Sequence, residues 1–216
     1  MFASIRRYRL VRGSMDELMR RVDDGFAERI SAQDGFVSYH AIDLGDGDII
    51  TVSVFGDPRQ AEASRELSRR WIETELDGIE LERLETLRSE IDVSRASTDL
   101  LEPLHAASGR EICSLRRYVL WEGPIDELLH RVDVSFAERV QGIDGFRGYM
   151  VFELGNYEIV ALTFFRDRAG AEASDQLAAR FVREELSDFD MERTDTRIGD
   201  VRVSRARAEV LAPEHA

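Results

Sequence analysis

The chain consists of one sequence unit repeated in tandem without a gap. Residues 1–106 and 111–216 align at a constant offset of 110 residues, with 44 of the 106 aligned positions identical. The run RRYRLVRGSMDELMRRVDDGFAERI, which begins at Arg6, matches RRYVLWEGPIDELLHRVDVSFAERV, which begins at Arg116. A solenoid needs at least three repeats, so two copies favour a fused dimer of like units. We therefore expect two domains of the same kind, residues 1–106 and 107–216.

Each unit has the pattern of an α+β domain with the element order βαββαβ. Alternating and β-branched residues predict strands in the first unit, and apolar residues three to four positions apart predict helices. The expected strands cover 3–11, 36–44, 49–55 and 89–95, and the expected helices cover 15–32 and a segment starting at Asp57. The turn Gly45-Asp46-Gly47-Asp48 predicts a hairpin between the two middle strands.

Local signals at the helix starts support this assignment. Ser14 and Glu17 have the spacing of a capping box. Pro124 takes the place of Ser14 in the second unit, where it fits the first helical position. Asp57-Pro58 reads as an N-cap followed by a first-turn proline. A buried face of Ala61, Ser64, Leu67, Trp71 and Leu76 is expected on the second helix, and a short helical tail over 98–104.

The predicted strands are apolar on both faces. Residues 49–55 and 159–165 alternate without a polar side. In a four-stranded antiparallel ferredoxin-like sheet, helices cover only one face. We therefore expect the two sheets to pack face to face within one chain as an internal pseudo-dimer. Their closure as a barrel would enclose a lumen able to hold a ligand.

Charge and composition exclude several function classes. The chain has 29 basic and 43 acidic residues, a net charge of −14. This balance argues against binding to nucleic acid or to an anionic membrane. No apolar run is long enough to span a membrane and no secretory signal is visible, so a cytoplasmic protein is expected. The single cysteine, Cys113, excludes an internal disulfide and reads as a small buried residue, and no cluster has metal-ligand spacing.

The unit resembles the antibiotic biosynthesis monooxygenase-like family of the dimeric α+β barrel superfamily. The resemblance lies in the element order, in the run GSMDELMRRVDDGF to DGFVSY and in FGDPRQAEASRELSRRW, once per half. It implies an intramolecular dimeric α+β barrel. It also implies oxygenation of a small aromatic or quinol-type metabolite with dioxygen and no cofactor. Family members commonly carry an Asn and a Trp on the second helix. Trp71 matches the Trp, whereas the neighbourhood Ser64-Arg65-Glu66-Leu67 contains no Asn.

Three residues of the first half are candidates for catalysis: His40, Trp71 and Tyr39. As a neutral imidazole, His40 could take a proton from a phenolic substrate. Trp71 either borders a ligand pocket or fills the space between helix and sheet, as Phe181 would in the second half. The remaining pocket candidates recur between the halves and are Tyr8, Arg7, Tyr118, Arg117, Tyr149 and Phe181. Because the second half has Phe181 and Met150 in place of Trp71 and His40, the first half is the expected functional one.

The recurring arginines have an alternative reading as ion pairs. At least one of Arg6 and Arg7, and of Arg116 and Arg117, must find a carboxylate or reach water. Asp23 and Asp133, with Glu28 and Glu138, recur as possible partners. Two functions stay open at this point: an enzyme related to cofactor-independent monooxygenases, and a non-catalytic ligand-binding or structural barrel. The missing Asn and the Trp kept in one half only are the features that separate the two.

Overall fold

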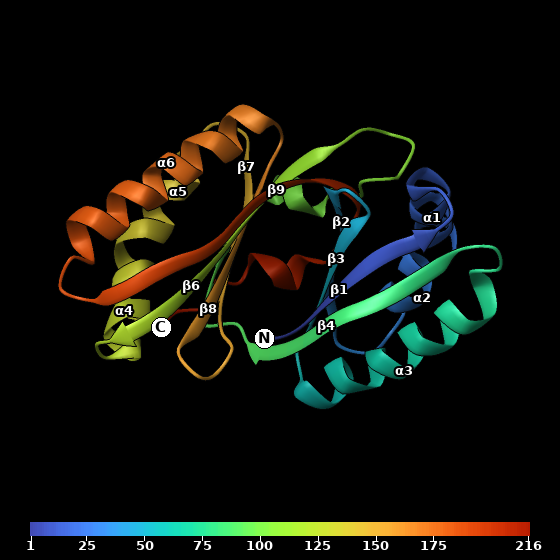
Figure 1. Ribbon diagram of the computed structural model, residues 1–216, viewed down its shortest axis with the longest axis horizontal. Coiled ribbons are helices and arrows are strands. Elements are labelled where there is room, and N and C mark those ends of the chain that lie inside the picture. The colour runs from blue at the N-terminus through green and yellow to red at the C-terminus, as the bar shows by residue number, and fades with distance from the viewer. The chain divides into compact units, whose positions relative to one another are not determined.

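The computed structural model describes residues 1–216, and it divides them into two compact units (Figure 1). Unit 1 comprises Met1–Ser89, Leu100–Arg110 and Asp200–Val210. Unit 2 comprises Glu90–Asp99, Glu111–Gly199 and Leu211–Ala216. Each unit therefore includes short segments from the other half of the sequence. The boundary between 106 and 107 stays a prediction about the duplicated sequence, because the compact units exchange segments across it.

Unit 1 is a mixed α+β unit with the hydrogen-bonded strand order β4-β1-β3-β2-β9. Pairs β1–β3, β2–β3 and β2–β9 are antiparallel. Its strands are β1 (Phe2–Arg12), β2 (Phe36–Gly45), β3 (Asp48–Phe55), β4 (Glu80–Glu90) and the last part of β9 (Asp190–Ala206). Its helices are α1 (Met15–Arg21), α2 (Glu28–Ser31) and α3 (Pro58–Glu75), with a π-helical turn, Val22–Ala27, joining α1 to α2.

Unit 2 repeats this plan with the order β9-β6-β8-β7-β5. Pairs β6–β8, β7–β8 and β5–β7 are antiparallel. Its further strands are β5 (Val93–Ala96), β6 (Glu111–Glu122), β7 (Phe146–Glu153) and β8 (Glu158–Phe165). Its helices are α4 (Ile125–Arg131), α5 (Glu138–Gln141) and α6 (Arg168–Glu185), again with a π-helical turn, Val132–Ala137, between the first two. Short 3-10 helices follow β5 and β9 at Thr98–Leu101 and Ala208–Leu211.

Most predicted elements of the first half are confirmed. The hairpin between β2 and β3 turns at Asp46 and Gly47, both with positive φ, as a tight two-residue turn requires. Asp57 caps α3 by accepting a hydrogen bond from the Arg59 amide, with Pro58 in the first turn. On α3, Ala61, Ser64 and Trp71 are buried, and Leu76 is buried just beyond its end, whereas Leu67 is only half-buried at the edge of the core. The short tail expected over 98–104 is the 3-10 helix at Thr98–Leu101.

Three local predictions are wrong. Ser14 stands at the N-cap of α1 but its side chain makes no capping hydrogen bond, and the Glu17 carboxylate pairs with Arg20 and Arg21 instead of completing a capping box. Pro124 is the N-cap residue of α4, one position before the helix. The fourth strand does not begin at residue 89. The chain runs as β4 up to Glu90, breaks at residues 91–92 and continues as β5 from Val93. The matching segment of the second half is the unbroken 17-residue strand β9.

In each unit, the helices cover one face of the strands and enclose an apolar core (Figure 1). The unit 1 core centres on Phe26, whose ring contacts those of Tyr39 and Trp71 at centroid distances of 5.3 Å. The unit 2 core centres on Phe136, which contacts Tyr149 and Phe181 at 5.4 Å. No helix combines the length and the apolar character that crossing a bilayer requires.

Candidate functional site

Each unit contains a cavity between its helices and its strands. The cavity of unit 2 has a volume of about 40 Å³ and that of unit 1 about 30 Å³. Every residue lining the unit 1 cavity except Met19 has its repeat partner in the lining of the unit 2 cavity. The duplication has therefore preserved a cavity together with the fold. These cavities are not the lumen that the sequence analysis expected between two sheets.

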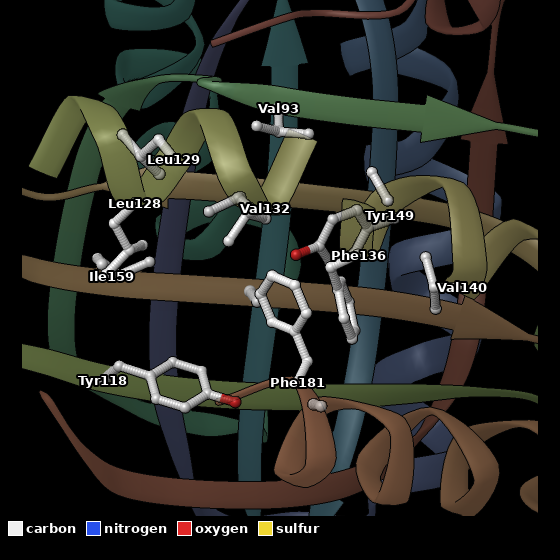
Figure 2. Packing of buried hydrophobic residues seen from close by; sticks show 14 of the residues in the cluster. Val93, Tyr118, Leu128, Leu129, Val132, Phe136, Val140, Tyr149, Ile159 and Phe181 are labelled. Carbon is white, nitrogen blue, oxygen red and sulfur yellow. The ribbon is translucent and has the colours of Figure 1, made fainter. Parts of the chain in front are cut away.

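The walls of the unit 2 cavity are aromatic and aliphatic, with three polar side chains among them. Phe136 comes from the π-helical turn and Phe181 from α6, while Arg116 and Tyr118 lie on β6 and Tyr149 on β7. In Figure 2 the hydroxyl ends of Tyr118 and Tyr149 both point toward the Phe181 side chain. An apolar cavity with a few convergent polar groups is the usual form of a small-molecule site.

A larger recess of about 200 Å³ adjoins the unit 2 cavity. It is lined by Tyr118, Ala179, Val182 and Arg193, and it shares Tyr118 and Val182 with the inner cavity. An apolar cavity of about 150 Å³ is enough to hold benzene. The inner cavity alone is smaller than that, so a ring-sized ligand needs the recess as well, or a shift of Tyr118.

Three tyrosine hydroxyls in the two cavities, those of Tyr39, Tyr118 and Tyr149, are protonated donors at neutral pH. Burial raises the pKa of Tyr39, Tyr118 and Tyr149 above the ordinary tyrosine value. In unit 1, the Tyr8 hydroxyl lines the cavity and is buried without a hydrogen-bond partner. Leaving a buried hydroxyl unpaired costs free energy, and a polar ligand atom in the cavity would satisfy it.

The predicted catalytic residues do not form one site. Tyr39 and Trp71 line the unit 1 cavity. His40 follows Tyr39 on β2, and because successive strand residues face opposite ways, it lies on the other side of the sheet. It is fully buried, and its Nδ1 lies 3.0 Å from the Ser204 hydroxyl. Burial lowers the pKa of His40 to about 4.

Four of the six further pocket candidates line the cavities: Tyr8, Tyr118, Tyr149 and Phe181. Arg7 and Arg117 do not. Arg7 donates to the Asp48 carboxylate at 2.6 Å, and the Arg117 Nε lies 3.2 Å from the Glu158 carboxylate. In each arginine pair the preceding residue points inward instead: Arg116 lines the unit 2 cavity, whereas Arg6 is buried but does not line the unit 1 cavity. That the first half is the functional one stays a prediction, and the larger recess lies in unit 2.

The inward-facing arginines, Arg6 and Arg116, are each 1% exposed. Arg6 donates to the hydroxyls of Ser53 and Ser64. Arg116 donates to Thr163 Oγ1 at 2.6 Å and to the Ser174 carbonyl oxygen at 3.0 Å. Thr163 and Ser174 are the repeat partners of Ser53 and Ser64, so both units hold the guanidinium in the same way.

The acidic residues expected beside these arginines bind others instead. In unit 1, Asp23 lies 2.6 Å from Arg205 and 3.2 Å from His105. In unit 2, Asp133 lies 2.5 Å from Arg95 and 3.0 Å from His215. Glu28 and Glu138 lie farther out, at 3.5 and 3.8 Å from the same two arginines. Both aspartates lie at the second position of a π-helical turn. Each cluster therefore joins this turn to a strand that comes from the other half of the sequence, β9 in unit 1 and β5 in unit 2.

Cys113 is a free and fully buried cysteine, as the sequence analysis expected. Burial raises the pKa of its thiol to about 12, which keeps it in the unreactive thiol form. No group of three or more His, Cys, Asp or Glu side chains lies close enough together to hold a metal ion.

No protein-family model matches the chain, and no curated protein matches it. Solved structures match along nearly its whole length. A candidate monooxygenase from Fusobacterium nucleatum superposes with a TM-score of 0.67 at 7% identity, covering 99% of this chain and 94% of its own. A candidate monooxygenase from Lactobacillus acidophilus gives 0.65 at 9% identity, with coverages of 95% and 97%.

An anthrone oxidase-like protein superposes with a TM-score of 0.55 at 13% identity, covering 98% of this chain and 95% of its own. At such identities the likeness shows the fold alone. The chain is thus a mixed α+β protein that shares its fold with these solved structures, whose names refer to monooxygenases and to an anthrone oxidase-like protein.

Proposed function

We propose that the protein is a monooxygenase-like oxidoreductase that binds a small aromatic molecule in the cavity between helices and sheet. The observation that carries the proposal is the repeat-equivalent cavity. Two copies that differ at most of their positions keep an aromatic-walled space with two tyrosine hydroxyls. A core selected for packing alone would fill such a space, since each cavity lowers stability.

The substrate class follows from what the cavity offers. It supplies apolar walls and hydrogen-bond donors, but no base for use near pH 7, because neither lining contains a carboxylate or a histidine and His40 faces elsewhere. The substrate must therefore ionise readily by itself and give its own electrons to dioxygen. An anthrone-type benzylic CH₂ has this property, and the neighbour of that name supports the choice.

The reaction needs no cofactor for its electron balance. In R₂CH₂ + O₂ → R₂C=O + H₂O, two C–H bonds break, one oxygen atom enters the product and the other leaves as water. The protein holds the substrate anion by its oxygen, with Tyr118 and Tyr149 donating, and excludes bulk water from the apolar walls. Donors placed where charge develops and a dry cavity are the means by which a protein accelerates such a step.

The wider family assignment belongs to the same proposal. We propose that the chain is a tandem member of the antibiotic biosynthesis monooxygenase-like family, with two ferredoxin-like units packed sheet to sheet. The strand orders β4-β1-β3-β2 and β9-β6-β8-β7 support the ferredoxin-like plan. Strand residues that face away from the helices, such as His40, Val52 and Val54, are fully buried, which supports a covered second sheet face.

Oxygen uptake with anthrone tests the function. The expected result is protein-dependent uptake of one O₂ per anthrone above the uncatalysed rate, with one ¹⁸O atom from ¹⁸O₂ in the product ketone. The double variant Tyr39→Phe/Tyr149→Phe should lose at least tenfold in rate, since each oxyanion donor contributes roughly 10²-fold or more. Trp121→Phe, at an exposed ring outside both cavities, is the matched control and should leave the rate unchanged. Uptake equal to that of buffer would contradict the enzyme assignment.

A non-catalytic ligand-binding protein is the second candidate. It is favoured by the absence of an Asn on α3 and by the lack of a base in either cavity. Anthrone that binds, as judged by equilibrium dialysis, but is not turned over would establish this alternative.

A further inference from the structure

Arg116 differs from most buried arginines of this protein in having no carboxylate partner. Five arginines are buried: Arg6, Arg95, Arg116, Arg202 and Arg205. Arg95, Arg202 and Arg205 each lie within 3 Å of an aspartate. Arg6 and Arg116 have only hydroxyls, plus one backbone carbonyl at Arg116. The chain therefore neutralises its buried cations with acidic side chains except at one repeated position.

An uncompensated buried guanidinium is costly, and acidic residues are abundant in this chain. Arginine cannot shed its charge by deprotonation in a protein. A charge taken out of water needs a counter-charge, and neutral hydroxyls replace only part of the lost hydration. Because this position carries arginine in both repeats, with the same hydroxyl partners, it was retained rather than replaced by an apolar residue. The missing negative charge is then expected to come from outside the chain.

The surroundings of Arg116 show where that charge would sit. Arg116 lines the unit 2 cavity. The hydroxyl-bearing rings of Tyr118 and Tyr149, shown in Figure 2, line it as well. The Phe136 ring lies against its guanidinium, with Cζ 5.6 Å from the ring centroid. On the outer side, the recess beyond Tyr118 carries a second arginine, Arg193, on β9. The cavity thus combines one buried positive charge, two donors and flat apolar walls.

We propose that the unit 2 cavity selects an aromatic monoanion, whose ionised oxygen pairs with Arg116 while its ring lies against Phe136 and Phe181. This inference rests on the proposed function, which places a ligand in the cavity. It adds the charge of the ligand and the residue that recognises that charge. Arg116 is then the residue that gives the cavity a higher affinity for an oxyanion than for a neutral molecule of the same shape. A phenolate, an enolate and a carboxylate share this chemistry.

Benzoate and benzamide form a matched pair of probes, since they have the same shape and differ in charge. A reporter variant with Trp71→Phe, Trp121→Phe and Phe181→Trp places the only tryptophan in the unit 2 cavity, so that its fluorescence reports binding there. Benzoate should bind roughly 10- to 100-fold more tightly than benzamide, the range expected for a hydrogen bond to a charged group. Arg116→Met in this background should remove the preference, and Arg116→Lys should retain part of it.

Arg117→Met is the control, because Arg117 follows Arg116 on β6 but lies outside the cavity and should leave the preference intact. Thermal unfolding separates binding from a structural role. A site built for an external anion should leave Arg116→Met as stable as the parent or more so, since an unpaired buried charge is removed. A destabilised Arg116→Met variant with an unchanged benzoate preference would overturn the inference.

The failures of the two proposals are distinguishable. If both probes change the emission at position 181 with equal affinity, the cavity binds ligands but the choice of an anion is wrong. If neither probe binds the unmodified protein in equilibrium dialysis at millimolar concentration, the cavity is not the binding site, and the proposed function fails along with the inference.

Discussion

At the scale of single residues, His40 shows how burial fixes a protonation state. It is fully buried on β2, and burial lowers its pKa from 6.5 to about 4. In the unfolded chain the imidazole takes up a proton below about pH 6.5, whereas in the folded chain it does so only below about pH 4. The unfolded state therefore binds more protons between these values, and folding stability falls as the pH falls from 6.5 toward 4.

His40→Met should remove this part of the pH dependence, since Met150 occupies the same position in the second half. From the difference between the two pKa values, the parent protein should lose about 3 kcal/mol of its free energy of unfolding between pH 7 and pH 4 through His40. Urea unfolding of both proteins at pH 7, 5.5 and 4 measures it. The variant's stability should decline less steeply with acid. Parallel pH profiles would show that His40 titrates normally in the folded state.

At the scale of elements, the two aspartates in the π-helical turns fasten strands to helices. Asp23 and Arg205 are both 9% exposed at their side chains, and Asp133 and Arg95 are 4% and 7% exposed. Removing one partner of a buried ion pair leaves the other charge uncompensated. Asp23→Asn and Asp133→Asn should each lower the free energy of unfolding by roughly 3 kcal/mol.

Glu28→Gln and Glu138→Gln are the matched controls. These carboxylates face the same arginines, but they are 70% and 66% exposed, so the loss should stay below about 1 kcal/mol. Chemical denaturation of the four variants distinguishes the two classes. Equal losses for aspartate and glutamate variants would show that the clusters act through general surface charge and not as buried pairs.

The elements that sequence could predict are those with a clear period. The hairpin, the capped helix α3 and the strands of the sheet centre follow from alternation and turn residues. Strand β4 was not predictable in this way, because its apolar residues Leu81, Leu84 and Leu87 lie three positions apart in a charged segment. Its strand conformation comes from pairing with β1 and not from its own pattern.

The candidate site was predictable in part, from the residues that recur in both halves of the sequence. The tyrosines recur in both halves and do line the cavities. Recurrence could not show which of Arg116 and Arg117 lines the cavity, since both recur. That depends on the direction in which each side chain points from β6. Alternation along β2 does imply that Tyr39 and His40 face opposite sides, so their grouping as one site conflicted with the strand that contains them.

At the scale of the whole molecule, each compact unit depends on segments from the other half of the sequence. Residues 200–206 pair with β2 in unit 1, and β5 pairs with β7 in unit 2. A polypeptide of residues 1–110 alone lacks the strand that pairs with β2. Its own residues Val93–Ala96 have the same sequence, VSRA, as residues 203–206. A second copy could therefore supply the missing strand.

We expect the 1–110 fragment to fold only as a strand-exchanged dimer that unfolds on dilution, because the folded state then depends on protomer concentration. Mixing it with the 111–216 fragment should restore the full-length circular dichroism spectrum. Analytical ultracentrifugation over a hundredfold concentration range measures the first effect. A folded monomer of residues 1–110 would show that the exchanged strand is dispensable.

The charge of the whole chain also bears on how an anionic ligand reaches a buried arginine. At a distance of roughly 20 Å, a net charge of −14 repels a monoanion by about 3 kcal/mol in salt-free water. The screening length falls from about 30 Å at 0.01 M salt to about 8 Å at 0.15 M. The repulsion therefore weakens with salt, whereas the pairing with Arg116 is shielded by burial.

Benzoate should bind severalfold more tightly, with a faster association rate, at 0.15 M than at 0.01 M sodium chloride, and benzamide should show no such change. This salt dependence of the association rate is opposite to that of proteins that attract a ligand by surface charge of the opposite sign, where added salt slows association. Stopped-flow fluorescence with the tryptophan at position 181 measures both rates. Slower benzoate association at high salt would mean that a local positive field, such as that of Arg193 beside the recess, outweighs the charge of the chain.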